Sequence, residues 1–277
     1  MPAFATNDSL DWTVEKRPLT FPGNDGTPVV WDNQMVMVRT DNGRPLGPIS
    51  SGYEPVQNSV LKQKIDPMVS EGVLTIENMG YLSHGAKVFI QAKLAKDFVV
   101  VDEKHEAYLT LLNCHTGKAS VAMGTAAVRV ICGNTFAMAY SGISERYRHT
   151  EGVNELVMES TAVVDFVNEC MGAYAARVEK LALAPCSVDK FQDVLEQVYQ
   201  KDIANMRNVE LMVDLFKGGT GGGNNGSNLA DAFNAITDFG SNFSRKAEAS
   251  RFNYVNFGTG VSINRRAMDV LTEMAAV

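Results

Sequence analysis

The fold class is decided by residues 153–181, which read VNELVMESTAVVDFVNECMGAYAARVEKL. Apolar side chains recur there at spacings of three and four, the period of an amphipathic α-helix. They are Val153, Leu156, Val157, Val163, Val164, Val167, Cys170, Met171, Tyr174, Val178 and Leu181. The pattern predicts one long helix ending at Pro185.

Downstream of Pro185 the helical period continues. Ser187 can cap the next helix, whose apolar stripe runs over residues 191–198. Residues 217–228 hold six glycines in twelve positions and are interpreted as a flexible connector or a mobile loop. The other expected elements are helices at 203–216, 229–239 and 263–274, with a glycine-punctuated turn at 254–261.

Upstream of residue 153 the chain changes to short strand-like runs with turn residues between them. Pro55 is expected to be the first residue of the one helix in this half, and Pro67 to kink or interrupt that helix. A sheet with one helix packed on it is the economical arrangement for this order. The predicted strands lie at 33–40, 74–79, 87–94, 107–112 and 118–132.

We therefore expect an α+β fold. An N-terminal antiparallel sheet with a packed helix occupies residues 1–150, and a helical region with the glycine-rich loop occupies residues 151–277. The 277 residues are 45% hydrophobic and 21% charged, which is a globular composition and excludes a disordered or collagen-like chain. The longest apolar runs are far shorter than the ~18 residues of a membrane span, so no membrane association is expected.

The N-terminus shows no basic start followed by an apolar stretch, so no signal peptide is expected. The four cysteines have no C-x-x-C or disulfide-framework spacing. Both features predict a cytoplasmic protein whose thiols are reduced and buried. The four are Cys114, Cys132, Cys170 and Cys186.

Charge is unevenly distributed along the chain. The net charge is −7, and residues 151–216 hold five basic and twelve acidic side chains. Residues 113–150 hold four basic and one acidic, and a second basic segment covers residues 244–266. The excess of acid argues against a uniformly basic surface, but the two basic segments could each meet a polyanion.

Enzyme motifs are incomplete. Gly117-Lys118-Ala119-Ser120 resembles the end of a phosphate-binding loop but lacks its first glycine and the hydroxyl after lysine. Cys114-His115 has no second pair at metal-ligand spacing, and neighbouring strand residues point to opposite faces. We predict no catalytic residue, no metal and no cofactor.

Two polar segments remain, and two interpretations of them stay open. Asn113, His115 and Lys118 belong to a polar turn between strands, while Arg129 is followed by a Gly-Asn-Thr break at Asn134 that can start a helix at Phe136. These groups could bind phosphate. Alternatively, the amides and hydroxyls only satisfy the backbone of the turns.

Sequence-tolerant binding of a single strand needs a basic groove with aromatic side chains. Tyr140, Tyr147, Phe252 and Tyr254 are interleaved with the two basic segments. The alternative is that these aromatics are core and the arginines pair with acidic helices. Besides the residues of the polar segments, the candidate nucleic-acid contacts are Arg146, Arg148, Arg245, Lys246, Arg251, Arg265 and Arg266.

Several motifs in a fixed order resemble the phage/plasmid-like protein family known as domain of unknown function 932. The resemblance covers most of residues 10–275, and the 217–228 stretch departs from it by being longer and looser. It implies a protein of a bacterial or phage cytosol, plausibly in mobile-element DNA metabolism, and supplies no catalytic residues. The motifs are Leu10–Pro18, Val38–Asp41, Leu46-Gly47, Gly52–Asn58, Asn113–Gly117, Arg129–Thr135, Arg148–Thr150, Phe233–Asp238 and Phe257–Gly260.

The leading hypothesis is a single-stranded DNA binding or annealing protein that acts as a homo-oligomer in recombination or replication. It rests partly on fold-level analogy with known annealing proteins. One alternative is an enzyme of nucleic-acid or nucleotide chemistry, with His115 as the acid–base group beside Asn113, Arg129 and Asn134. Another is a protein that binds a host factor through the acidic residues 151–216.

Overall fold

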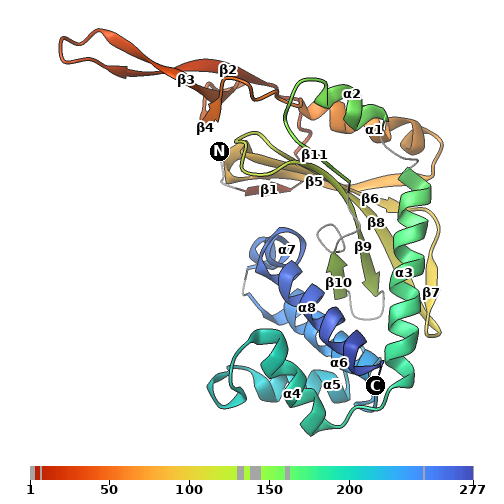
Figure 1. Ribbon diagram of the computed structural model, residues 1–277. Helices are drawn as coiled ribbons and strands as arrows, with labels where there is room; N and C mark the ends of the chain where they lie inside the picture. Colours follow the sequence, from red (N-terminus) through yellow and green to blue (C-terminus); the bar gives the residue numbers. More distant parts are fainter. Residues whose placement is uncertain are drawn as a thin grey trace. The chain divides into compact units, whose positions relative to one another are not determined.

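Figure 1 shows the computed structural model, which describes residues 4–6, 8–129, 134–137, 145–159, 163–245 and 247–276. The strands form a larger sheet in the order β1-β5-β6-β8-β9-β10, with β7 on β8 and β11 on β9, and a smaller sheet β2-β3-β4. The strands are β1 (Phe4–Thr6), β2 (Val14–Pro22), β3 (Pro28–Arg39), β4 (Pro45–Ser50), β5 (Leu74–Leu82), β6 (Lys87–Leu94), β7 (Phe98–Val100), β8 (Glu103–Cys114), β9 (Val121–Arg129), β10 (Asn134–Ala137) and β11 (Glu145–Tyr147).

The helices of the described residues follow the strands, except for α1. They are α1 (Asn58–Ser70), α2 (Val153–Glu159), α3 (Val163–Leu183), α4 (Val188–Tyr199), α5 (Val209–Lys217), α6 (Leu229–Asp238), α7 (Glu248–Phe257) and α8 (Thr259–Met274). This order confirms the α+β class. No helix in the described ranges has both the length and the apolarity to cross a membrane.

The chain divides into two compact units, each built from several segments. Unit 1 contains Met1–Ala95, Leu109–Met123 and Glu145–Val163. Unit 2 contains Lys96–Tyr108, Gly124–Ser144 and Val164–Val277. The expected boundary near residue 150 does separate the strands from the helices after α1, while the units themselves are discontinuous in sequence.

The core of unit 1 forms between its central strands and α1. Strand β6 is buried almost throughout, with Val88, Phe89 and Ile90 fully buried. Helix α1 packs against β5 and β6, and it buries Leu61 and Ile65 completely. A strand buried on both faces explains why its apolar run is nearly continuous rather than strictly alternating.

Helix α1 corrects two expectations. It begins at Asn58 rather than Pro55, because Gln57 is held in an extended conformation by two hydrogen bonds between its side chain and the backbone of Val14 (3.0 and 2.8 Å). Pro67 lies inside the helix, which continues to Ser70. The proline sits one turn from the helix end, where the chain closes anyway with Gly72 at φ +72°.

Strands β2 and β3 form a long two-stranded hairpin within unit 1 (Figure 1). Its turn is closed by Asp25, which accepts hydrogen bonds from the Thr27 amide (3.0 Å) and hydroxyl (2.6 Å). Toward the turn the apolar side chains are exposed, Trp31 to 57% and Val30 to 56%, and Phe21 packs edge-on against Trp31. The hairpin therefore presents an apolar end.

The core of unit 2 forms between its helices, with α6 and α8 both buried along one face. Ser187 caps α4 by accepting a hydrogen bond from the Lys190 amide, as predicted. The predicted stripe on α4 is fully buried, and Phe191 stacks on Phe216 of α5 with ring centroids 4.6 Å apart. The expected helix at 203–216 is instead a short 3-10 turn followed by α5, separated where Asn208 adopts φ +66°.

The glycine-rich residues 217–228 form specific contacts, unlike the connector that composition suggests. Buried Asp238 accepts hydrogen bonds from the amide and hydroxyl of Thr220 (2.7 and 2.8 Å). Buried Asn224 donates to the Leu215 carbonyl (2.8 Å), and Asn228 caps α6. Four of the glycines have positive φ, so they permit backbone turns that bring these polar groups to their partners.

Two further expectations were wrong, and one lies partly outside the described residues. Phe136 does not start a helix but lies in β10, opposite Ala127 of β9, where the strand pairing satisfies its backbone. Residues 254–261 are not a turn, because α7 and α8 are separated by Gly258 alone, and a Cβ at Gly260 would lie 2.6 Å from the Tyr254 carbonyl. The glycines there allow two helices to approach closely. The single helix expected from residue 153 is described as α2 and α3, and residues 160–162 between them lie outside the described residues.

Candidate functional site

Asn113 and His115, two of the expected ligand contacts, have no exposed surface. They lie at the end of β8 in unit 1, facing the segment that leads into α1. The Asn113 side-chain amide donates to the Val56 carbonyl (2.7 Å), and His115 Nε2 bonds Asn58 Oδ1 (3.0 Å). Because Asn58 uses its amide group to donate to the Trp12 carbonyl (2.9 Å), its oxygen must accept from His115. Nε2 of His115 therefore carries the proton.

A second histidine, His149, belongs to the same interior. It packs parallel to Tyr53 with ring centroids 4.5 Å apart, and its Nδ1 donates to the Glu54 carbonyl (3.0 Å). The Tyr53 hydroxyl donates to the Cys114 carbonyl (2.6 Å), next to His115. Three buried acceptors of this cluster have no hydrogen-bonding partner among the described residues: Asn113 Oδ1, His115 Nδ1 and His149 Nε2.

Burial sets the protonation of these groups. Burial lowers the pKa of His115 to about 3, and the nearby His149 and Arg39 lower it further. Burial also lowers the pKa of His149 and raises the pKa of the Tyr53 hydroxyl. At neutral pH the imidazole of His115 is uncharged, so it holds no second proton to donate as a general acid there.

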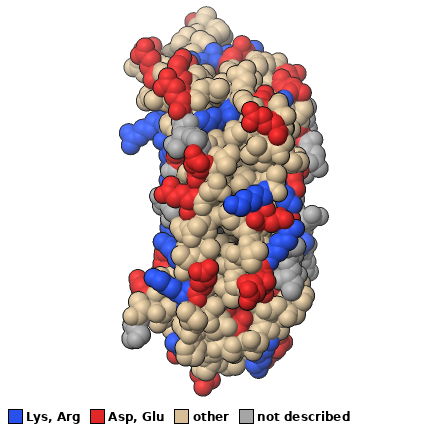
Figure 2. Space-filling model, turned by 90° about the vertical axis from the view of Figure 1, so that its right-hand side faces the viewer, with Lys and Arg blue, Asp and Glu red and all other residues tan. Residues whose placement is uncertain are grey.

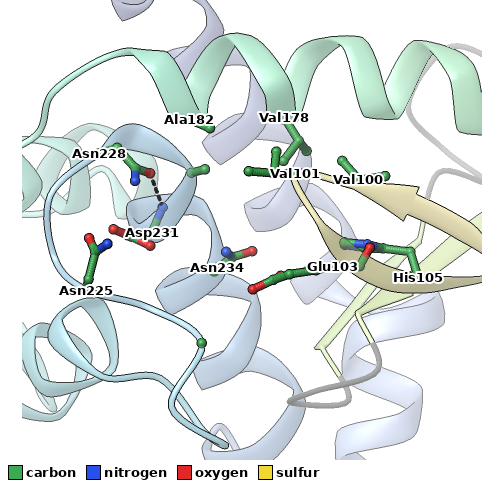
Figure 3. A pocket seen from close by; sticks show the side chains of 12 residues that line it. Val100, Val101, Glu103, His105, Val178, Ala182, Asn225, Asn228, Asp231 and Asn234 are labelled. Atoms are coloured by element: carbon green, nitrogen blue, oxygen red, sulfur yellow. Dashed lines mark hydrogen bonds between the residues drawn. The ribbon is translucent and has the colours of Figure 1, made fainter.

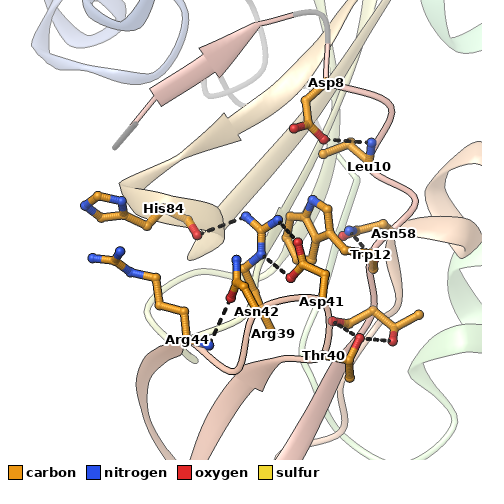
Figure 4. Close-up of polar contacts among 11 residues, drawn as sticks. Asp8, Leu10, Trp12, Arg39, Thr40, Asp41, Asn42, Arg44, Asn58 and His84 are labelled. Atoms are coloured by element: carbon orange, nitrogen blue, oxygen red, sulfur yellow. Dashed lines mark hydrogen bonds and ion pairs between the residues drawn. The ribbon is translucent and has the colours of Figure 1, made fainter. Parts of the chain in front are cut away.

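Arg39, at the end of β3, is the charged member of the cluster (Figure 4). It is 1% exposed and holds Asp41 through two hydrogen bonds, at 3.0 Å from Nε and 2.7 Å from Nη2. Its third bond goes to the His84 carbonyl (3.2 Å), and its guanidinium carbon lies 3.9 Å from the centroid of the Trp12 ring. The guanidinium keeps the pKa of Asp41 below its usual value.

These residues, here called the polar core, come from five of the segments on which the family resemblance rests. Sequence reasoning placed only Asn113 and His115 in a site. Arg39-Thr40-Asp41, where a cation and an acid stand two apart at a strand end, was the available signal for the pair. The polar core consists of Trp12, Arg39, Asp41, Tyr53, Asn58, Asn113, His115 and His149.

Three of the candidate cations are exposed in unit 1: Lys118, Arg146 and Arg148. Arg146 lies on β11 beside Tyr147, whose register partner on β9 is Val121. Lys118 precedes Val121 by three residues and Arg148 directly follows Tyr147, so the three cations lie near the same end of the β9–β11 pair.

A second group of cations lies in unit 2. Arg245 is exposed, and its guanidinium carbon lies 4.9 Å from the centroid of the Tyr254 ring. Arg251 on α7 donates to the Arg245 carbonyl (2.8 Å). Arg265 on α8 is exposed, whereas Arg266 donates to the Val198 carbonyl (2.6 Å), which commits it to the fold.

Some predicted residues cannot be placed to the same degree. The backbones of Arg129 and Asn134 are register partners in β9 and β10, but their side chains, and the whole of Lys246, lie outside the described residues. Cys132 lies outside as well, whereas Cys114, Cys170 and Cys186 are buried free thiols, as predicted. Within the described part of the chain, no cluster of three or more metal-ligating His, Cys, Asp or Glu side chains occurs.

Charge of both signs is interspersed on the face drawn in Figure 2, where blue and red side chains alternate over a broad uncharged surface. An acidic block, as expected for residues 151–216 acting alone, does not dominate this face. The local cation groups, rather than a field of one sign, are therefore the features from which a polyanion interface can be argued.

The fold and its polar core define an α+β protein with a buried hydrogen-bonded cluster and two separate groups of surface cations. The chain belongs to a family described as domain of unknown function (DUF932), whose model matches residues 45–267. This match confirms the resemblance read from the motifs. No curated protein and no solved structure matches the chain.

Proposed function

We propose that this protein binds single-stranded DNA and acts as a homo-oligomer in recombination or replication of a mobile element in the bacterial cytoplasm. The observation that carries the proposal is the contact between Arg245 and Tyr254 in unit 2, next to Arg251. A cation beside an aromatic ring supplies the two interactions that a single strand offers without regard to sequence, phosphate charge and base stacking.

The surroundings of this contact support a strand-binding surface. Phe243 is 44% exposed, and Phe252 on α7 is half-buried and packs edge-on against Phe257. Arg265 adds an exposed cation on α8. We name this set, Phe243, Arg245, Arg251, Phe252, Tyr254 and Arg265, the cation–aromatic surface.

The exposed cations of unit 1 extend the proposal to a second contact region. Lys118, Arg146 and Arg148 would meet phosphates, with Tyr147 beside them on β11. Asn113 and His115 are not part of the proposed interface, because side chains with no exposed surface offer no atom to a strand. Their hydrogen bonds serve the polar core instead.

The apolar end of the β2–β3 hairpin supports the oligomeric part of the proposal. Trp31, Val30 and Phe21 are exposed there, to 57%, 56% and 49%. Exposed apolar groups gathered at one place favour contact with another protein surface. A second copy of the chain is the partner we propose.

The interface is tested by binding of a labelled single-stranded oligonucleotide to matched double variants. Arg245→Gln with Arg251→Gln removes two cations from the cation–aromatic surface. Arg177→Gln with Lys180→Gln removes two exposed cations from α3, elsewhere in unit 2. We expect the first variant to lose about tenfold in affinity at moderate salt and the second to bind like the wild type. Equal losses in both would reduce the effect to net charge and reject the assigned surface.

A further inference from the structure

Unit 2 contains a cavity of about 150 Å³ that the DNA-binding proposal does not use (Figure 3). It is bounded by the turn between β7 and β8, the last turns of α3, the glycine-rich loop and the start of α6. At about 30 Å³ for a water molecule in the liquid, the cavity has room for a small molecule of about five or six non-hydrogen atoms.

Acceptor groups converge on this cavity. Asp231 is 5% exposed, and it lies near Asn225 and Asn228 at one side of the cavity in Figure 3. The Ser227 amide donates to Asp231 Oδ2 (3.0 Å), which holds the carboxylate in place. Glu103 lines the cavity from β8, where its carboxylate extends toward Asn234.

The rest of the lining is aliphatic. Val100 and Val101 contribute from the β7–β8 turn, Val178 and Ala182 from α3, and Ala230 from α6. Val101 has φ +50°, an unusual conformation for a β-branched residue, and it places the side chain at the cavity. Backbone strain of this kind is often retained where a binding site depends on it.

Carboxylates and carboxamides beside aliphatic walls select the chemical class of the occupant. A bare divalent cation prefers oxygen ligands on all sides, which this half-aliphatic lining does not supply. An anion would meet two carboxylates, and among the described residues no lysine or arginine lines the cavity. An alkyl chain carrying an ammonium group matches both parts, because the ammonium donates to the carboxylate and amide oxygens while the methylenes contact the valines.

We infer that this cavity binds a small aliphatic amine, with the ammonium group held by Asp231 and the alkyl chain against Val101 and Val178. The site lies apart in sequence from the cation–aromatic surface, and it involves a different ligand. The anchored conformation of residues 217–228 gains a role from it, because that loop places Gly223 and Asn225 at the wall of the cavity.

Isothermal titration calorimetry of the full chain with 1,4-diaminobutane tests the inference. 1,4-Butanediol, which has the same length and no charge, and calcium chloride serve as comparison ligands. We expect saturable binding of the diamine, at least tenfold weaker binding of the diol, and no competition by calcium. Binding of calcium alone, equal binding of diol and diamine, or no binding of the diamine would each overturn the inference.

Variants locate the site. Asp231→Asn keeps the shape and an oxygen for the Ser227 amide but removes the charge, and it should weaken diamine binding at least tenfold. Ala182→Leu fills the cavity without changing any charge and should abolish binding even if the Asp231 variant folds poorly. Glu179→Gln, at an exposed position on α3 next to Val178, is the matched control and should bind as the wild type does. Unchanged binding in Ala182→Leu would place any amine site elsewhere.

Discussion

The guanidinium carbon of Arg39 lies 3.9 Å from the centroid of the Trp12 ring, while the same guanidinium holds Asp41 with two hydrogen bonds. The first residue is 1% exposed and the second 8%. A Cβ at Gly85, which has φ +106°, would lie 3.0 Å from Arg39 Cδ and 3.1 Å from the Trp12 ring. Three separate segments of unit 1 are therefore fitted around one buried cation.

Removing the acid from this arrangement should destabilise the fold. Asp41→Ala leaves the Arg39 charge buried with only the His84 carbonyl and the ring faces as partners. We expect the free energy of unfolding to fall by about 2–3 kcal/mol, at the low end for a buried pair because the Asp41 side chain is 30% exposed. Urea denaturation measures the change.

The control for this prediction is an exposed ion pair in the same unit. Asp11 bonds Lys62 at 2.9 Å, but the Asp11 side chain is 70% exposed. Asp11→Ala should leave the unfolding transition essentially unchanged. If the two variants were equally stable, the buried pair would have no special role in unit 1.

Stability should decrease in mild acid because of His115. Its pKa is about 3 in the folded chain and 6.5 when unperturbed, so the unfolded state binds a proton between these values and the folded state does not. This contribution is complete above pH 6.5 and is lost as the pH falls toward 3. From pH 6.5 to pH 5 the free energy of unfolding should decrease by about 2 kcal/mol from this residue, at about 1.4 kcal/mol per pH unit.

Urea unfolding at both pH values distinguishes the cause. His115→Gln should be less stable than the wild type at pH 7 but should lose much less stability on acidification. Some dependence should remain, because burial lowers the pKa of His149 too. His84→Gln leaves the buried imidazoles in place and should keep the wild-type slope. A slope unaffected by His115→Gln would contradict the burial of this residue.

The glycine-rich loop should be held by Asp238. Asp238→Ala removes the acceptor of three groups: the Thr220 amide, the Thr220 hydroxyl and the Asn242 side chain. We expect a loss of about 1–3 kcal/mol in unfolding free energy and faster hydrogen exchange of the Thr220 amide. Asp214→Ala, at an exposed position on α5, should change neither. Rapid exchange of this amide already in the wild type would show an unanchored loop.

The hairpin end should control self-association. Val30→Thr with Trp31→Thr keeps residues that favour strands but removes the exposed apolar surface. Sedimentation velocity should show smaller species than the wild type, with unfolding free energy of the monomer changed by no more than about 0.5 kcal/mol. Val99→Thr on β7, 71% exposed, is the control and should not alter the assembly. Identical sedimentation of all three proteins would remove the hairpin from the oligomer interface.

Local patterns predicted much of the fold. The strand at Lys87–Leu94, the Ser187 cap and the buried stripe on α4 depend on period and capping, which a single sequence displays. The patterns failed where distant contacts decide. Glycine spacing at 254–261 indicates a turn, yet Gly260 is required because α8 approaches the Tyr254 carbonyl.

The polar core shows the same limit for the site. Asn113 and His115 could be identified as unusual polar residues in an apolar strand, but their direction could not. Their partners Val56 and Asn58 lie 57 residues away, and Trp12 is brought in only through Asn58. Interior and surface use the same residue types, so only tertiary pairing separates a buried amide from a ligand contact.

The proposed function is tested most directly by fluorescence anisotropy of a labelled single-stranded oligonucleotide titrated with the protein at about 50 and 200 mM salt. Each phosphate contact releases counterions, so the account predicts binding at low salt that weakens at least tenfold at the higher concentration. The slope with salt should be reduced by about two in the Arg245→Gln, Arg251→Gln variant. No binding at low salt, or binding that salt does not change, would contradict it.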